Sequence, residues 1–101
     1  MVDRPLRDAA VELADTVMLR FFDADGRLTA LPKKQAMRVA ALDVVATRFV
    51  PGVHYTELEI NRELMAVFDD YVGLRRELVD FGFLDRADGS YWRSGGTVQV
   101  W

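Results

Sequence analysis

The chain has 101 residues and a mass of 11.5 kDa, the size of one small domain. Half of the residues are hydrophobic, 29% are charged and cysteine is absent, which excludes a disordered or collagen-like chain, disulfides and thiolate metal sites. The net charge of −3 argues against a basic surface over the whole molecule, but a local basic patch remains compatible with it.

Apolar residues recur at steps of three and four over about residues 4–21, which predicts a first helix. Asp23 and Gly26 then indicate a turn, because glycine accepts positive φ and aspartate bonds nearby backbone N–H groups. A weak alternation over residues 28–31 indicates a short strand that ends at Pro32. Charged residues throughout the first helix leave no core for a signal peptide, and no apolar run is long enough to span a membrane. We therefore expect a soluble, cytoplasmic protein without a membrane partner.

A second helix is predicted from about Lys33 to Phe49, followed by a break at Pro51–Gly52 and an extended segment over residues 53–55. Thr56 with Glu59 is a capping box and marks the start of a third helix. Asp69–Asp70 is the start signal of a fourth, since a carboxylate there can cap free N–H groups.

The fourth helix carries an apolar stripe made of Tyr71, Leu74, Leu78 and Phe81. Gly82 fits the left-handed position after this helix, with Phe83 packing back on its last turn. Asp88–Gly89 between two short apolar segments predicts a β-hairpin. Residues 94–101 indicate a last short strand or a docked tail.

From Lys33 onward, the order of a long helix, a short strand, two short helices and a hairpin is typical of a winged helix-turn-helix. The tight break at Asp69–Asp70 fits the turn between the paired helices. A three-helix bundle with an unrelated hairpin would share most of these signals. The predicted fold class is α+β, mainly α: a winged helix-turn-helix with an extra N-terminal helix and a C-terminal β-hairpin wing. We expect a single domain over residues 1–101, with its core at about residues 28–93.

Several segments also resemble an uncharacterised bacterial family, domain of unknown function 2087. The resemblance covers roughly residues 20–93 and runs in order through Phe21–Asp23, Gly26–Leu28, Leu31–Lys34, Tyr55–Glu57, Asp70–Tyr71, Leu74–Val79, Gly82–Leu84 and Asp88–Arg93. It implies a winged-helix-like fold. Some members carry this segment behind an arsenic-repressor-type DNA-binding domain, which implies a sensor or interaction role for the shared segment in those proteins.

Catalytic constellations are scarce in this sequence. A nucleophile and base would have to combine the one histidine, His54, with Ser90 or Ser94, and a third group would have to orient the ring. His54 precedes a helix cap, so we expect a histidine at a strand edge or on the surface. We predict a protein that is not an enzyme and that has no cofactor and no metal site.

Basic residues gather at the start of the second helix. Lys33 and Lys34 are expected in its first turn, where the helix dipole opposes positive charge at a cost of about 0.3–1 kcal/mol each. An approaching phosphate would reverse that penalty, and Arg38 lies one turn further on the same face. The alternative is a solvated lysine pair that serves solubility.

On the fourth helix, the apolar stripe leaves Val72, Gly73 and Arg76 on the outer face. Gly73 would let a groove wall approach, and Arg76 would contact a guanine edge or a phosphate. The alternative for Arg76 is an ion pair with Asp80. We expect Arg75, on the flank, to form a structural ion pair. Arg86 and Arg93 on the hairpin complete the candidate DNA-binding set, which is Lys33, Lys34, Arg38, Val72, Gly73, Arg76, Arg86 and Arg93.

The stripe of the first helix must also be buried, either within its own domain or against a second copy of the chain. The leading hypothesis is a winged-helix protein that binds double-stranded DNA as a homodimer and regulates transcription. The alternative is a non-enzymatic winged-helix-like module that binds a protein and no nucleic acid.

Overall fold

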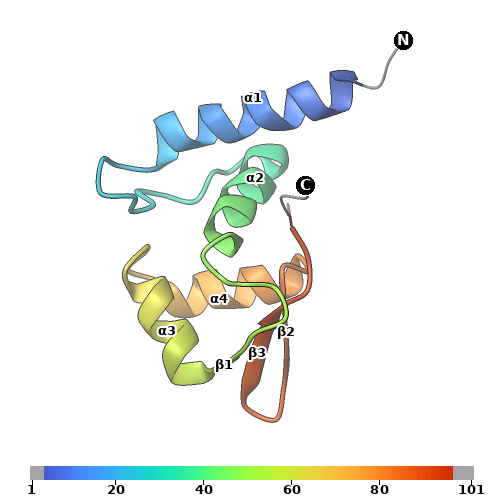
Figure 1. The fold of residues 1–101 in the computed structure, drawn as a ribbon. Helices are drawn as coiled ribbons and strands as arrows, with labels where there is room; N and C mark the ends of the chain where they lie inside the picture. Colours follow the sequence, from blue (N-terminus) through green and yellow to red (C-terminus); the bar gives the residue numbers. More distant parts are fainter. Residues whose placement is uncertain (1–3, 97–101) are drawn as a thin grey trace. The chain divides into compact units, whose positions relative to one another are not determined.

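The computed structural model describes residues 4–96, with residues 4–12 described by their backbone alone. The chain divides after Ala41 into two compact units, coloured along the sequence in Figure 1. The single domain predicted over residues 1–101 stays a prediction, and the strand or docked tail predicted at the C-terminus lies largely outside the described residues.

The first unit contains α1, Arg4–Phe21, with the bounds that the sequence predicts. The turn that follows is built by Asp23, whose Oδ1 accepts hydrogen bonds from the N–H groups of Asp25 and Arg27, both at 2.9 Å. The strand predicted over residues 28–31 is wrong: the segment makes a single antiparallel bridge, Phe22 with Leu28. The turn is so tight that the segments on either side of it pair at this one position only.

Helix α2 spans Gln35–Ala46 and is shorter at both ends than the sequence predicts. The carbonyl of Lys34 accepts the hydrogen bond from the Arg38 N–H at 2.8 Å, so Lys34 caps the helix and Lys33 precedes it. The prediction that both lysines lie inside the first turn of this helix is therefore wrong, because the helix begins at Gln35. At the other end, the Phe49 N–H bonds to the Ala46 carbonyl at 3.0 Å in a tightened turn.

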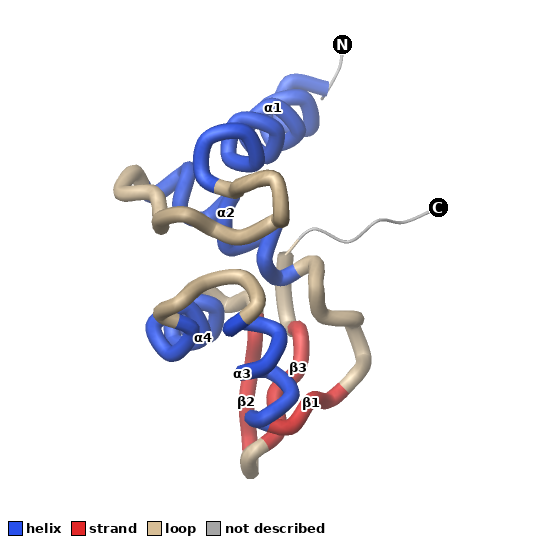
Figure 2. Tube along the Cα trace, turned by 90° about the vertical axis from the view of Figure 1, so that its left-hand side faces the viewer, coloured by secondary structure: helices blue, strands red, loops and turns tan. Residues whose placement is uncertain are grey.

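The second unit holds residues 42–46 at the end of α2 and all the later elements. Figure 2 shows its three strands next to one another and α3 and α4 beside them. The strands form an antiparallel sheet in the order β1-β3-β2, and α3 packs on α4. This sequence of elements and this strand order are those of a winged helix-turn-helix, as predicted. Their bounds are β1 His54–Thr56, α3 Glu57–Met65, α4 Tyr71–Asp80, β2 Leu84–Ala87 and β3 Ser90–Arg93.

The predicted caps are all present. Thr56 and Glu59 form the reciprocal capping box of α3, with bonds of 3.2 and 2.8 Å. The Asp70 side chain caps α4 through the Gly73 N–H at 3.1 Å. In the hairpin, Asp88 and Gly89 both have positive φ, of 52° and 78°, which is the pairing that a type I′ turn requires.

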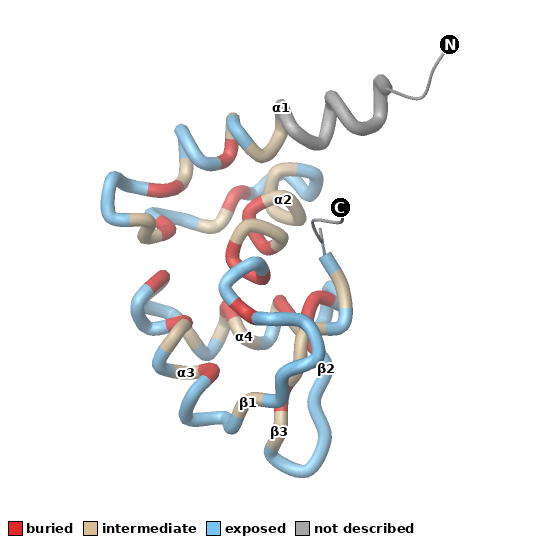
Figure 3. The backbone as a smooth tube through the Cα atoms, viewed as in Figure 1, coloured by how far each residue is buried: buried red, intermediate tan, exposed pale blue. Residues whose placement is uncertain are grey.

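The core of the second unit contains buried apolar side chains from α3, α4, β2 and β3, and Figure 3 marks buried positions in red. Leu74 and Leu78 of the α4 stripe are fully buried. Phe81 was predicted to join them but is 39% exposed, because α4 ends at Asp80 and Gly82 turns the chain with φ +81°. Phe83 is buried in its place, and its N–H bonds back to the Leu78 carbonyl at 2.8 Å.

Candidate nucleic-acid interface

The outer face of α4 is open, as the sequence predicts. Val72 is 42% exposed, and Arg76 and Asp80 are also exposed. Within residues 13–96, whose side chains the structure describes, Arg76 forms no ion pair with Asp80 or any other carboxylate. The guanidinium of Arg76 is therefore available to a ligand.

The structure explains the glycine at position 73 by a steric requirement that the sequence analysis did not predict. A Cβ at this position would overlap the Oδ2 atom of Asp70, whose Oδ1 accepts the capping bond from the Gly73 N–H. The missing side chain makes room for the helix cap. The expectation that Gly73 serves the approach of a groove wall therefore loses its main support.

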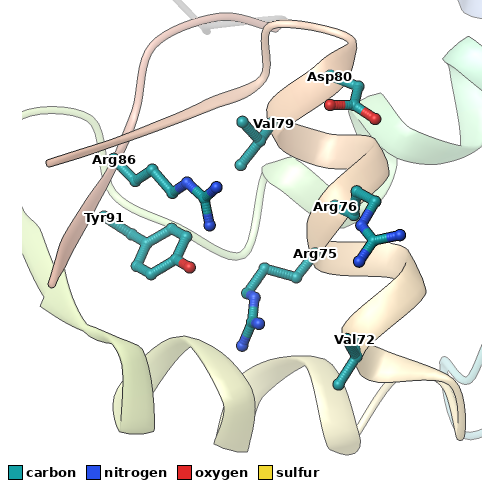
Figure 4. A pocket seen from close by; sticks show the side chains of 7 residues that line it. All are labelled: Val72, Arg75, Arg76, Val79, Asp80, Arg86 and Tyr91. Atoms are coloured by element: carbon teal, nitrogen blue, oxygen red, sulfur yellow. The ribbon is translucent and has the colours of Figure 1, made fainter.

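A hollow of about 120 Å³ separates α4 from the hairpin and is bordered by three arginines, Arg75, Arg76 and Arg86 (Figure 4). Arg75 donates to the Oδ1 atom of Asn61 on α3, and its guanidinium carbon lies 5.8 Å from the centre of the Tyr91 ring. The ion pair predicted for Arg75 is wrong, because an uncharged amide oxygen and an aromatic ring take the place of a carboxylate. Arg75 holds α4 to α3.

Arg86 extends from β2 beside Tyr91 in the same hollow (Figure 4). A hydrogen bond with the Tyr91 side chain is the main cause that raises the pKa of Arg86 above its ordinary value. The Tyr91 hydroxyl donates in turn to Oε1 of Glu57 at 3.2 Å. Arg86 is exposed, so its charged guanidinium faces solvent beside the buried Tyr91.

Two of the predicted DNA-binding side chains, those of Arg38 and Arg93, form hydrogen bonds with backbone carbonyls of this chain. Arg93 donates from Nε to the Gly95 carbonyl at 3.1 Å and from Nη1 to the Phe49 carbonyl at 3.3 Å. Arg38, in the first unit, donates from Nη1 to the Pro32 carbonyl at 2.9 Å. Both side chains are half-buried, so we remove Arg38 and Arg93 from the candidate interface.

Lys33 and Lys34 lie in the first unit and are exposed. Neither makes an ion pair or a side-chain hydrogen bond with the residues whose side chains are described. The interpretation of the doublet as a phosphate contact stays a prediction.

The structure brings His54 to Ser90, with 3.3 Å between Nδ1 and Oγ, and stacks its ring on Trp92 with 4.7 Å between ring centres. His54 is exposed on the outer strand β1, as expected. No carboxylate bonds to its other ring nitrogen within residues 13–96. The same part of the chain contains no group of three His, Asp or Glu side chains with the geometry of a metal site.

Sequence reasoning missed Tyr91, which links α3, α4 and the hairpin. A two-residue turn at Asp88–Gly89 fixes the register of the hairpin and places Arg86 opposite Tyr91. The turn signal in the sequence was therefore enough to predict this cross-strand pair. The contact of Arg75 with Asn61 had no such signal, because the two residues lie on different helices.

The fold has the α+β layout of a winged helix-turn-helix. Residues 27–93 match the family model of uncharacterised proteins conserved in bacteria, DUF2087, and the chain belongs to that family. No curated protein and no solved structure gives a significant match. Among the described helices, none combines the length and apolar character needed to cross a membrane.

Proposed function

We propose that this protein binds double-stranded DNA through α4 and the hairpin, as a cytoplasmic, non-enzymatic transcriptional regulator that acts as a homodimer. The observation that carries the proposal is that an exposed, unengaged Arg76 on the second helix of a helix-turn-helix and an exposed Arg86 on the wing border the same hollow. In this fold the second helix enters the major groove and the wing lies along the backbone.

The two arginines suit different contacts. Arg76 lies in the middle of the outer face of α4, where a fork of N–H donors would reach a guanine edge or a phosphate. Arg86 is exposed on the hairpin at the border of the hollow, where its guanidinium would reach a backbone phosphate. Val72 on the same face supplies apolar surface for a thymine methyl group.

The charge of the second unit favours a second candidate. Residues 42–96 contain ten Asp and Glu but six Arg, and carboxylates next to α4 would repel phosphates. The acidic balance and the exposed Val72 and Phe81 fit an interaction module that binds a protein with a basic surface. The salt dependence of DNA binding separates the two candidates.

The decisive measurement is fluorescence anisotropy of a labelled random duplex at several salt concentrations. Arg76 and Arg86 are the cations of the α4 and hairpin face that remain after the removal of Arg93. If each neutralises one phosphate, the logarithm of affinity per protomer falls with the logarithm of salt at a slope near −2. Undetectable binding at low salt refutes DNA binding and leaves the interaction module.

Variants locate the contact. Arg76→Gln and Arg86→Gln each reduce the salt slope by about 1, because each removes one phosphate contact. Arg48→Gln is the matched control, since Arg48 lies on the surface before β1, with its Nε atom 3.4 Å from Oε1 of Glu63. Equal losses in all three variants would show that net charge alone drives binding. Light scattering of the free protein tests the homodimer.

A further inference from the structure

A second hollow lies within the first unit, where α1 ends and α2 begins. Its volume is about 370 Å³, in the lower part of the range of about 300–1,000 Å³ that small-molecule sites occupy, and it is open to solvent on one side. It is formed by the last residues of α1, by residues 30–34 and by Met37 in the first turn of α2. The hollow is distinct from the α4 face, which belongs to the other unit.

The floor of this hollow is apolar. Phe21, Leu31 and Met37 line it and are half-buried, so each presents hydrophobic surface that a ligand can cover. Pro32 beside them is buried, and Arg38 donates to the Pro32 carbonyl at 2.9 Å. This bond holds residues 30–34 against α2, so the walls of the hollow exist before any ligand arrives.

Three cations border the apolar floor: Arg20, Lys33 and Lys34. All three are exposed, and none is ion-paired with a carboxylate of residues 13–96. Arg20 is fixed over the edge of the floor, with its guanidinium carbon 5.5 Å from the centre of the Phe21 ring. No Asp or Glu lines the hollow.

We propose that this hollow binds a small amphipathic carboxylic acid. The apolar body of the acid covers Phe21, Leu31 and Met37, while its carboxylate lies between Lys33 and Lys34. An inorganic anion would leave the apolar floor in water, and a neutral apolar molecule would leave the cations without a partner. Only a ligand with both parts satisfies the whole site. The inference does not depend on DNA binding, which is assigned to the other unit.

The probe is octanoate, added below its micelle concentration to the isotopically labelled full chain and followed by backbone amide NMR. Octanoate should shift the amides of residues 20–37 and leave those of α4 and the hairpin in place. Acetate, which has the charge alone, and octanol, which has the apolar body alone, should each bind at least about tenfold more weakly, a difference of about 1.4 kcal/mol.

The double variant Lys33→Gln with Lys34→Gln tests the cations. Exposed ion pairs are weak, so loss of both lysine charges should weaken octanoate binding about fivefold. Lys33→Arg with Lys34→Arg keeps the charge and should retain the affinity. Arg48→Gln with Arg62→Gln removes the same charge from exposed positions in the second unit and should have no effect.

Three results would overturn the proposal. One is the absence of shifts in residues 20–37 at millimolar octanoate. Another is equal affinity for octanoate and octanol, which would show that the cations take no part. The third is equal weakening by the two glutamine double variants, which would reduce the effect to net charge. Because the readout is an NMR shift in the first unit, failure here is distinguishable from failure to bind DNA.

Discussion

Substitution of Gly73 by alanine separates the two explanations of this glycine. In α4, alanine is favoured over glycine by up to about 1 kcal/mol. Here the new Cβ would overlap Oδ2 of Asp70 and displace the carboxylate that caps the helix. Loss of such a cap costs about 1 kcal/mol, so the two effects cancel and Gly73→Ala should change the free energy of unfolding by less than about 0.5 kcal/mol.

A double-mutant cycle exposes this cancellation. Asp70→Ala alone should destabilise by about 1 kcal/mol, through loss of the 3.1 Å bond to the Gly73 N–H. In that background the overlap is gone, so Gly73→Ala should now stabilise by about 0.5–1 kcal/mol. The assay is urea unfolding followed by far-ultraviolet circular dichroism, with equal slopes required for all four proteins.

The result that refutes this reasoning is equal stabilisation by Gly73→Ala in both backgrounds. Asp70 would then move aside freely, and the cap would not explain the glycine. A Gly73→Ala variant of unchanged stability that loses DNA binding would restore the original interpretation, in which a groove wall approaches the bare backbone.

Four further outcomes follow from the contacts of the second unit. Thr56→Ala should lower the free energy of unfolding by about 1 kcal/mol in urea titrations, because the bond from the Glu59 N–H is lost; no change would mean that water replaces the cap. Tyr91→Phe should lower the free energy of unfolding by about 0.5–1.5 kcal/mol in the same titrations, because the hydroxyl bond to Glu57 is lost. It should also reduce DNA affinity, because Tyr91 lies beside Arg86; if stability and affinity are both unchanged, Tyr91 is not a positioning residue. Arg93→Met should lower the free energy of unfolding by about 1 kcal/mol and leave the slope of DNA affinity against salt unchanged. Arg76→Met should leave the free energy of unfolding unchanged and reduce that slope by about 1; the opposite pattern would contradict both assignments. Gly89→Ala should destabilise by about 1 kcal/mol because φ is +78°, and Asp88→Gly, which relieves a positive φ of 52°, is the matched control expected to be neutral or slightly stabilising.

Local signals predicted most of the fold. The capping box of Thr56, the cap of Asp70 and the Asp88–Gly89 turn each depend on residues within three positions of one another, so the sequence alone specifies them. The end of α4 was misplaced because Phe81 continues the helical spacing, while the left-handed Gly82 stops the helix before it.

The candidate site was less predictable because its geometry depends on contacts between elements. Exposure of Val72 and Arg76 followed from helical periodicity. The engagement of Arg93 by the Phe49 carbonyl joins positions 44 residues apart, and no local pattern announces it. A count of the basic residues in the sequence therefore exceeds the number of cations that are free to bind a ligand on the folded surface.

Among residues 4–96, strand β2 lies at one edge of the sheet and pairs only with β3. An unpaired edge offers its backbone donors and acceptors to a strand from another molecule, which is the usual first step of aggregation. This edge is four residues long and carries adjacent charges at Asp85 and Arg86, so an incoming chain would have to desolvate both. The arginine that supports the proposed nucleic-acid contact thus also protects the protein against self-association along its wing.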